Sequence, residues 1–332
     1  MKKILLLQTG GTIAMHFGKD GVTLAPDRWS ELLYREMPEL SDIAELHSES
    51  LFYEDSSDIN KTHWKQLCEV IYSNIDEYDG FVILHGTDTM AYTASALSFS
   101  FQNLSKPVIL TGSQVPMSNI RSDARRNLVN SVELATYPIH EVAICFNDHL
   151  FRGNRTTKMS IGDFDAFTSP NFSSLAEVGI NINLSDKIFR NANIETTCNP
   201  VFDDRLFTVR MHPNLPPSFL ECINLKEIKV VLIEAFGIGN IPVKGSYGMI
   251  PFVEKCREAG CHVIINSQAA YDSVDLSKYE SGRILQKMGA ISAGDMTMEA
   301  TITKTMNLLG LGLANDEFNA QFMTSLSGER SN

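Results

Sequence analysis

The 332-residue sequence predicts an α/β fold with a mostly parallel β-sheet. Short aliphatic runs alternate with amphipathic segments along most of the chain, and this alternation is typical of parallel strands covered by helices. Three of the aliphatic runs end in turns of glycine and hydroxyl residues. Because ligands bind outside the carboxyl ends of parallel strands, these turns predict a ligand site at one edge of the sheet.

The first part of the chain holds the clearest alternation. Its short aliphatic runs predict strands, and its apolar residues at helical spacing predict helices, as in "KTHWKQLCEVIYSN". The expected strands are 2–8, 80–85, 107–111 and 141–146, and the expected helices are 27–36, 61–74, 90–102 and 122–136.

The helical pattern fades from about 147 to 210, where short β-prone runs are separated by Asn, Asp and Pro turns. The stretch "IETTCNPVFDDR" indicates an edge segment or a linker. Alternation then returns, with strands expected within 228–240 and 261–268 and helices at 248–260, 297–309 and 315–326. Together with the length, this pattern favours two domains, predicted as 1–190 and 213–332 with a linker at 191–212.

Composition and charge narrow the class of protein. Hydrophobic residues make up 43% and charged residues 20%, which is typical of a globular protein, and the net charge of −12 makes nucleic acid and anionic membranes poor partners. The six cysteines show neither a C-x-x-C pair nor zinc spacing, so we expect reduced thiols. The apolar run Ile4–Leu7 is too short for a signal peptide, and no run is long enough for a membrane helix. We therefore expect a cytoplasmic protein.

The turns at the strand ends are Thr9–Thr12, Gly86–Thr89 and Thr111–Ser113. Glycine lets backbone N–H groups approach a ligand closely, although glycine also serves any tight strand-to-helix turn. No Walker pattern, G-x-G-x-x-G or G-x-S-x-G motif is present. A threonine nucleophile remains, and Thr12 is internal, so it needs a base other than a terminal amine.

Thr87 and Asp88, side by side in "HGTDT", are further candidates. A carboxylate at this place could hold a substrate ammonium or orient a lysine, and the alternative is that Asp88 caps the following helix. His85 lacks a second metal ligand at suitable spacing, so we expect no metal site.

The basic stretch "LFRGNRTTKMS" is either a solvated face or a way to bring Lys158 into a buried place beside Asp88, where the lysine could act as a base. The segment after Thr12, "IAMHFGKDGVTLAPD", lacks periodicity. It indicates either a surface loop or a lid over the site.

With these residues in view, the chain resembles the L-asparaginases, and most closely the bacterial type I cytoplasmic enzymes, over nearly its whole length. The motifs that carry the resemblance are "TGGTIAM", "DSSDI", "DGFVILHGTDTMAYTASALSF", "KPVILTGSQVP", "RGNRTTK", "FDAFTSPN", "FGIGN" and "GDMTMEATITK".

The resemblance implies a larger N-terminal domain with a mixed, mostly parallel sheet and a smaller C-terminal α/β domain. It implies hydrolysis of L-asparagine to L-aspartate and ammonia without metal or organic cofactor, by a homodimer that commonly pairs into a tetramer. The implied nucleophile is Thr12, with Thr87 also chemically competent. The implied proton-transfer set is Thr87, Lys158 and Asp88, and the implied substrate-binding residues are Asp55, Ser56, Ser57, Thr87 and Asp88.

Two departures from the family pattern matter. Val22 stands where many relatives carry a lid tyrosine, and Tyr279 in "LSKYESG" is the matching candidate to replace that tyrosine. Glu234 and Ala269 stand where some relatives carry an Arg and a Cys of a second asparagine site, so we expect that site to be absent, because a carboxylate repels a carboxylate effector.

Three other functions stay open at this point. A glutaminase-leaning amidohydrolase differs by one methylene of substrate. A non-catalytic amino-acid-binding protein could use the same pocket. An amide-transfer subunit that acts on a tRNA-linked substrate is disfavoured by the acidic balance.

Overall fold

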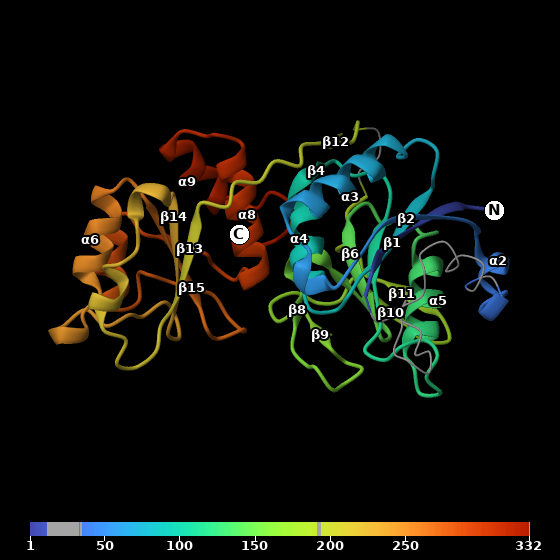
Figure 1. Cartoon of the computed structure of the whole chain (residues 1–332), viewed down its shortest axis with the longest axis horizontal. Coiled ribbons are helices and arrows are strands. Elements are labelled where there is room, and N and C mark those ends of the chain that lie inside the picture. The colour runs from blue at the N-terminus through green and yellow to red at the C-terminus, as the bar shows by residue number, and fades with distance from the viewer. Residues whose placement is uncertain (12–32, 34, 191–193, 332) are drawn as a thin grey trace. The chain divides into compact units, whose positions relative to one another are not determined.

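The computed structural model describes residues 1–11, 33, 35–190 and 194–331 (Figure 1). The chain divides into two compact units, 1–200 and 201–332, each with its own sheet and helices. The first sheet is mixed and the second is parallel, so the predicted α/β class is confirmed. The predicted domain bounds stay a prediction. Strand β13, Leu206–Arg210, falls inside the segment expected to be a linker and pairs in the second sheet.

The N-terminal unit is built on an eight-stranded sheet in the order β11-β10-β7-β6-β5-β3-β1-β2. The five strands from β6 to β2 run parallel, and β7, β10 and β11 add to it in antiparallel fashion. The strands are β1 Lys3–Gly10, β2 Glu45–Glu54, β3 Gly80–Leu84, β5 Val108–Thr111, β6 Val142–Phe146, β7 His149–Arg152, β10 Ala176–Val178 and β11 Ile182–Leu184.

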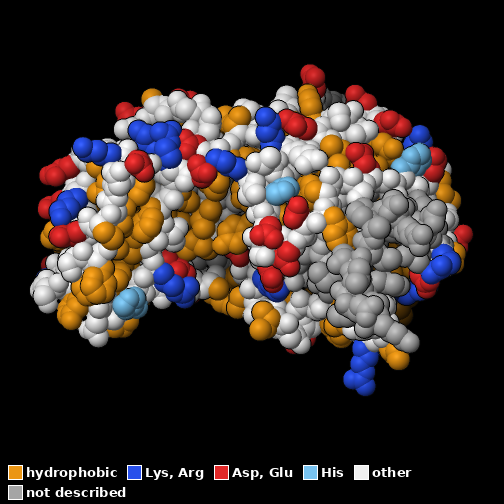
Figure 2. Space-filling model, viewed as in Figure 1, with side chains coloured by type: hydrophobic (Ala, Val, Ile, Leu, Met, Phe, Trp, Pro, Cys, Tyr) orange, Lys and Arg blue, Asp and Glu red, His pale blue; other side chains and the backbone are white. Residues whose placement is uncertain are grey.

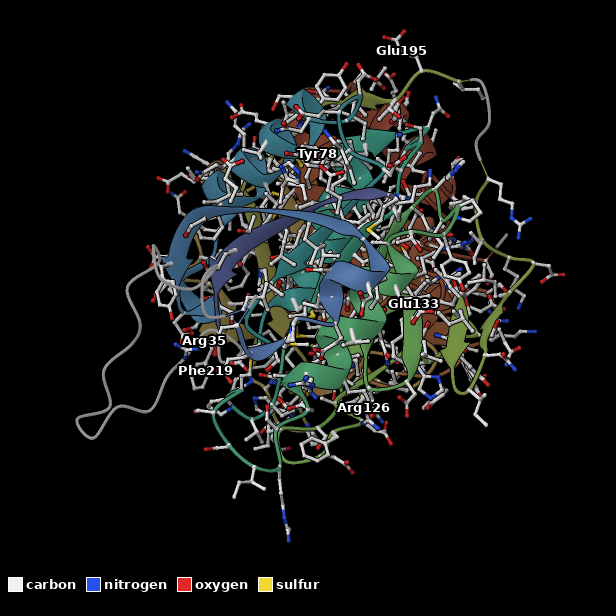
Figure 3. The ribbon with its side chains drawn as sticks, turned by 90° about the vertical axis from the view of Figure 1, so that its right-hand side faces the viewer. Arg35, Tyr78, Arg126, Glu133, Glu195 and Phe219 are labelled. Carbon is white, nitrogen blue, oxygen red and sulfur yellow. The ribbon has the colours of Figure 1, made fainter. Side chains whose placement is uncertain are left out.

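Helices cover both faces of this sheet (Figure 1). Side chains of a strand alternate between faces, so Ile4 and Leu6 of β1 pack in the core cluster formed with α2 (Leu40–Ile43) and α5 (Ala124–Leu134). Helices α3 (Lys61–Ser73) and α4 (Met90–Ser100) lie over the opposite face. Figure 3 looks onto the α5 side, where Arg126 and Glu133 are labelled. Burial on both faces explains why the central strands are continuous apolar runs.

Two small ladders complete this unit. β4 (Phe101–Gln102) pairs with β12 (Thr197–Cys198), so the predicted edge segment 194–205 does contain an edge strand. β8 (Thr157–Lys158) pairs with β9 (Phe167–Thr168). Short 3-10 helices form at Ser56–Asp58 and Gly153–Arg155.

The C-terminal unit has a four-stranded parallel sheet in the order β13-β14-β15-β16. β14 is Val230–Ala235, β15 is His262–Ser267 and β16 is Ile291–Ser292. Helices α6 (Ile250–Glu258) and α7 (Glu280–Lys287) share one core cluster with β14 and β15, and α8 (Met298–Gly310) and α9 (Asn315–Met323) lie on the other side (Figure 1). The remaining 3-10 helices are Pro217–Leu220, Leu225–Glu227 and Gly245–Tyr247.

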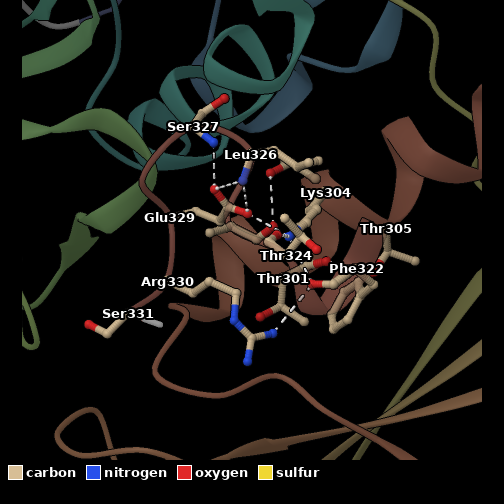
Figure 4. Close-up of polar contacts among 12 residues, drawn as sticks. Thr301, Lys304, Thr305, Phe322, Thr324, Leu326, Ser327, Glu329, Arg330 and Ser331 are labelled. Carbon is tan, nitrogen blue, oxygen red and sulfur yellow. Dashed lines mark hydrogen bonds and ion pairs between the residues drawn. The ribbon is translucent and has the colours of Figure 1, made fainter. Parts of the chain in front are cut away.

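A fully buried ion pair fastens the C-terminal segment to α8 (Figure 4). Lys304 Nζ donates to Glu329 and to the carbonyl oxygens of Phe322 and Thr324, at 2.8 and 2.6 Å for the two carbonyls. Glu329 in turn accepts from the backbone N–H groups of Leu326 and Ser327. Burial lowers the pKa of Lys304, and the Glu329 carboxylate opposes that effect. The pair is fully satisfied, which a buried charge requires.

Several elements differ from the sequence prediction. β2 was missed because "ELHSESLFYE" is half-exposed at the edge of the sheet and has no apolar run. α7 was missed because "ESGRILQK" contains Ser and Gly, which are weak helix formers. α2 and β16 are too short to give a pattern. Most of the helix predicted at 27–36 lies outside the described residues.

The surface and the cysteines agree with the bulk composition. Acidic and basic side chains are interspersed on the face seen in Figure 2. All six cysteines are free thiols, as predicted. Within the described ranges, no helix is long and apolar enough to cross a membrane.

Candidate active site

The ends of β1, β3 and β5 lie in register at one edge of the N-terminal sheet. Gln8 is level with Leu84, and Leu84 is level with Thr111. The Thr9 hydroxyl donates to Leu84 O at 2.7 Å and joins the first two strand ends. The three turns predicted from the sequence therefore do meet, because parallel strands end on the same side.

The glycines of these turns are required by close packing of backbone on backbone. Gly11 has φ +82°, and a Cβ there would lie 2.5 Å from Gly86 N. A Cβ at Gly86 would lie 2.6 Å from Ser56 Oγ, and one at Gly112 would lie 2.3 Å from His85 O. The glycines thus bring the turns into contact with one another, whatever they also offer a ligand.

Lys158 joins Thr87 and Asp88 at this edge. Its Nζ donates to Thr87 Oγ1 at 2.7 Å and to Asp88 Oδ1 at 2.6 Å. The Lys158 side chain is 15% exposed, whereas Asp88 is 66% exposed, so a largely buried ammonium meets a carboxylate that faces outward. Lys158 reaches this place because β8 follows the 3-10 helix Gly153–Arg155 and pairs with β9.

Thr87 has a second polar neighbour that the sequence reasoning missed. Thr87 is 8% exposed, and its hydroxyl donates to Gln114 Oε1 at 3.2 Å. The Gln114 amide donates to Ser160 O and Asp163 O, and Gln114 N donates to the Asp123 carboxylate. Since Lys158 Nζ donates to Thr87, the Thr87 hydroxyl proton points to Gln114. The only signal in the sequence was the position of Gln114 in the third turn, "TGSQVP".

The segment after β2 supplies a third set of groups. Asp55 caps the 3-10 helix Ser56–Asp58 and accepts from Ser57 Oγ at 2.6 Å and Ser57 N at 2.8 Å. Both hydrogen bonds lower the pKa of the exposed Asp55 carboxyl, and the one from the Ser57 hydroxyl has the larger effect. Thr89 Oγ1 donates to Ser56 O at 2.6 Å, so this segment is tied to the Thr87–Asp88 turn.

The buried His85 side chain holds the turn that carries Thr87. Its Nδ1 lies 2.7 Å from Gly86 O, which can only accept, so Nδ1 carries the proton. Nε2, 2.8 Å away from Thr93 Oγ1, therefore accepts the Thr93 hydroxyl proton, and Trp64 Nε1 donates to the same oxygen at 3.1 Å. Complete burial lowers the pKa of His85 to about 4, so the ring is neutral near pH 7. Its hydrogen bonds fix the Gly86 carbonyl immediately before Thr87. Among the described residues, no group of three His, Cys, Asp or Glu side chains is arranged to hold a metal.

The chain matches two family models along most of its length. Residues 3–190 match "Asparaginase, N-terminal", and residues 205–322 match "Glutaminase/Asparaginase C-terminal domain".

The chain belongs to the asparaginase family.

Relatives and solved structures of the asparaginase family agree with this assignment. L-asparaginase 1 of Escherichia coli K12 is 36% identical over 334 residues, covering 99% of this chain and 98% of the relative. The crystal structure of L-asparaginase I from Vibrio cholerae has a TM-score of 0.88 at 36% identity and covers 100% and 99% of the two chains. The thermostable L-asparaginase from Thermococcus kodakarensis has a TM-score of 0.89 at 34% identity and covers 99% of each. The two-domain asparaginase fold predicted from the motifs is therefore confirmed.

In this asparaginase-family chain, two sequence alternatives were wrong. Asp88 is not a helix cap, because α4 begins after Thr89 and has no side-chain cap. The basic stretch is not a solvated face either, because Arg152 and Arg155 are 4% and 2% exposed. The Arg152 guanidinium pairs with buried Glu141 at 2.6 Å and lies over the Phe189 ring. These arginines hold the segment that ends in Lys158 against the body of the unit.

Thr12, Val22 and the proposed lid lie outside the described residues. Tyr279 is exposed at the start of α7 in the C-terminal unit. Glu234, in β14, pairs with Arg210 at 3.1 Å.

Proposed function

We propose that the protein hydrolyses L-asparagine to L-aspartate and ammonia. The contact of Lys158 with both Thr87 and Asp88, at the edge where the glycine turns meet, is the observation that carries the proposal. It supplies a hydroxyl, an amine and a carboxylate in one hydrogen-bonded set, which amide hydrolysis by a threonine nucleophile needs. The family, with relatives named L-asparaginase, supports the same reaction.

In the proposed mechanism, the Thr12 hydroxyl adds to the side-chain amide carbon, ammonia leaves, and water resolves the acyl-enzyme. Lys158 moves protons through the Thr87 hydroxyl, and Asp88 stabilises the ammonium charge. Backbone N–H groups near Gly11 and Thr87 polarise the amide carbonyl. The order in which Thr12 and Thr87 act is part of the proposal: we assign the first attack to Thr12 and keep Thr87 as the alternative nucleophile.

Asp55, Ser56 and Ser57 are proposed to bind the substrate's α-amino and α-carboxylate groups, with help from Thr87 and Asp88. The hydrogen bonds from Ser57 favour the ionised form of Asp55, as an ammonium ligand requires. Ser56 lies against Gly86, and Thr89 ties the two segments together, so substrate groups and reacting groups share one rigid frame. No metal or organic cofactor enters this mechanism.

The experiment is ammonia release by the intact protein over a wide range of L-asparagine concentrations, with L-glutamine alongside. Lys65→Met, an exposed lysine of α3, is the matched control for Lys158→Met. Release from asparagine that is lost in Lys158→Met and kept in Lys65→Met supports the proposal.

Two of the three alternative functions give different results in the same experiment. Faster release from glutamine would favour the glutaminase-leaning alternative, since one methylene changes binding by only about 1–3 kcal/mol. Thermal stabilisation by asparagine without any release would favour an amino-acid-binding protein.

We also propose that the protein is a cytoplasmic homo-oligomer, a dimer or a dimer of dimers. Six free thiols support a reducing compartment. Ile120, Ile161 and Ile180 are almost wholly exposed in the single chain, and an interface between copies would bury such side chains. Sedimentation velocity at micromolar concentration tests the state, and a monomer there would contradict the proposal.

A further inference from the structure

Two cysteines that are far apart in the sequence lie together in the N-terminal unit. Cys68 is fully buried on α3, and Cys198 is half-buried on β12, 130 residues later. Cys198 Sγ donates to the backbone oxygen of Cys68 across 4.0 Å, so the Cys198 thiol lies against the residue that carries the second thiol. Helix α3 and strand β12 pack directly against each other.

The two thiols differ in reactivity. The hydrogen bond from Cys68 lowers the pKa of Cys198 against the opposing effect of burial, and the thiolate is the nucleophilic form. Burial, the Cys198 sulfur and the Glu69 carboxylate raise the pKa of Cys68, so its proton stays available to Cys198. Cys198 is thus the accessible thiol with the lowered pKa, and Cys68 is its buried neighbour.

The remaining cysteines lack this combination. Burial raises the pKa values of Cys145, Cys256 and Cys261. Cys222 is exposed, and its Sγ donates to the Phe219 carbonyl oxygen. Cys222 is therefore an internal control for exposure without an adjacent thiol.

We propose that Cys198 and Cys68 form a peroxide-reactive pair that closes to a disulfide. The Cys198 thiolate attacks one oxygen of a hydroperoxide, the O–O bond breaks, and a sulfenic acid forms while the leaving oxygen takes a proton to become water or an alcohol. Cys68 sulfur then attacks Cys198 sulfur and releases its proton. The S–O bond breaks, and the departing oxygen leaves as water. Two thiols lose two electrons in total, and one peroxide gains them.

The second step requires the two sulfurs to come together. A disulfide needs sulfurs about 2 Å apart and Cα atoms about 4.4–6.8 Å apart, so the Cys198 sulfur must turn from the Cys68 carbonyl oxygen to the Cys68 sulfur. Cys198 has room to rotate because it is half-exposed on a two-residue edge strand. The sulfenic acid is neutral, so part of the effect that raises the pKa of Cys68 is removed when Cys198 is oxidised.

The disulfide would join a helix near the proposed substrate-binding residues to a strand near the end of the N-terminal unit. α3 begins three residues after the 3-10 helix Ser56–Asp58, and β12 ends three residues before Val201, where the second unit begins. Closing a loop of this length restricts the unfolded chain, so the oxidised protein should melt at a higher temperature than the reduced one.

The test uses the intact protein and hydrogen peroxide, followed by peptide mapping without reductant. The expected result is a peptide pair linked through Cys68 and Cys198, reversed by dithiothreitol, together with an upward shift in Tm. In Cys68→Ser, dimedone should trap a sulfenic acid at Cys198, severalfold faster than at Cys222. Cys222→Ser should form the linked pair at the unchanged rate.

The mapping of the unsubstituted protein needs no variant, so a variant that fails to fold does not remove the test. No linked pair at peroxide concentrations that already oxidise Cys222 would overturn the proposal. So would a linked pair that joins Cys198 to another chain, or equal dimedone labelling of Cys198 and Cys222.

Discussion

Glu329→Gln should destabilise the C-terminal unit more than any surface charge substitution. Lys304 and Glu329 are both 0% exposed, so the substitution leaves a buried ammonium without its counter-charge. The new amide group would also direct N–H donors at Leu326 N or Ser327 N, which now donate to the carboxylate. Breaking a buried pair from one side costs about 3–5 kcal/mol, and we expect a loss in that range.

The assay must separate the two units, because a single free energy of unfolding is not well defined for a protein with more than one domain. Hydrogen exchange read by mass spectrometry on peptides of α8 and α9 reports the local free energy of opening. Glu280→Gln is the matched control, since its pair with Lys244 at 3.4 Å is exposed on both sides. Such a pair is worth about 1 kcal/mol or less.

A double variant sharpens the measurement. Lys304→Met with Glu329→Leu leaves no unpaired charge and should recover part of the loss. Recovery should be incomplete, because the Thr324 carbonyl and the Leu326 and Ser327 N–H groups lose these hydrogen bonds. If Glu329→Gln changes protection no more than Glu280→Gln does, the buried pair does not hold the C-terminal segment, and the reasoning is refuted.

Four further predictions concern the proposed enzyme. Lys158→Met should lower kcat for asparagine by about 10²–10⁴ without a matching change in KM, as loss of a proton-transfer group does, and a rate within twofold of the unsubstituted enzyme would exclude that role. Tyr279→Phe should lower turnover sharply, and an unaffected rate would remove Tyr279 from the mechanism. The rate should rise hyperbolically with asparagine, because Glu234 disfavours a second site, whereas a sigmoidal curve would contradict that expectation. His85 in the folded protein has a pKa of about 4, whereas in the unfolded chain it takes up a proton near pH 6.5, so this group removes about 2 kcal/mol of stability between pH 7 and 4.5. In urea unfolding of the N-terminal unit, His85→Gln should therefore lose correspondingly less stability between these two pH values. An equal loss of stability in His85→Gln would contradict the assignment.

Much of the fold could be predicted because it follows local periodicity. Continuous apolar runs such as Phe81–Leu84 are buried on both faces, which is typical of the strands of a covered parallel sheet. Elements without such a pattern were missed, among them the half-exposed edge strand β2 and the Gly-containing helix α7. In both, packing against a neighbour outweighs the weak local preference.

The same distinction between local pattern and tertiary packing applies to the candidate site. The sequence by itself determined that Thr9, Thr87 and the glycines lie at or just after strand ends, and parallel strands bring such ends to one edge. Only the tertiary structure decided that Lys158 contacts Asp88, 70 residues away, and that Gln114 accepts a hydrogen bond from the Thr87 hydroxyl.

The tertiary structure also paired Lys304 with Glu329 and Cys68 with Cys198. The spacing of apolar residues along the sequence determines the strands and helices. The direction in which the strands run determines the edge of the sheet where a site forms. Contacts between distant side chains depend on how the finished elements pack, because buried charges and thiols take whichever partners the surrounding core places within reach.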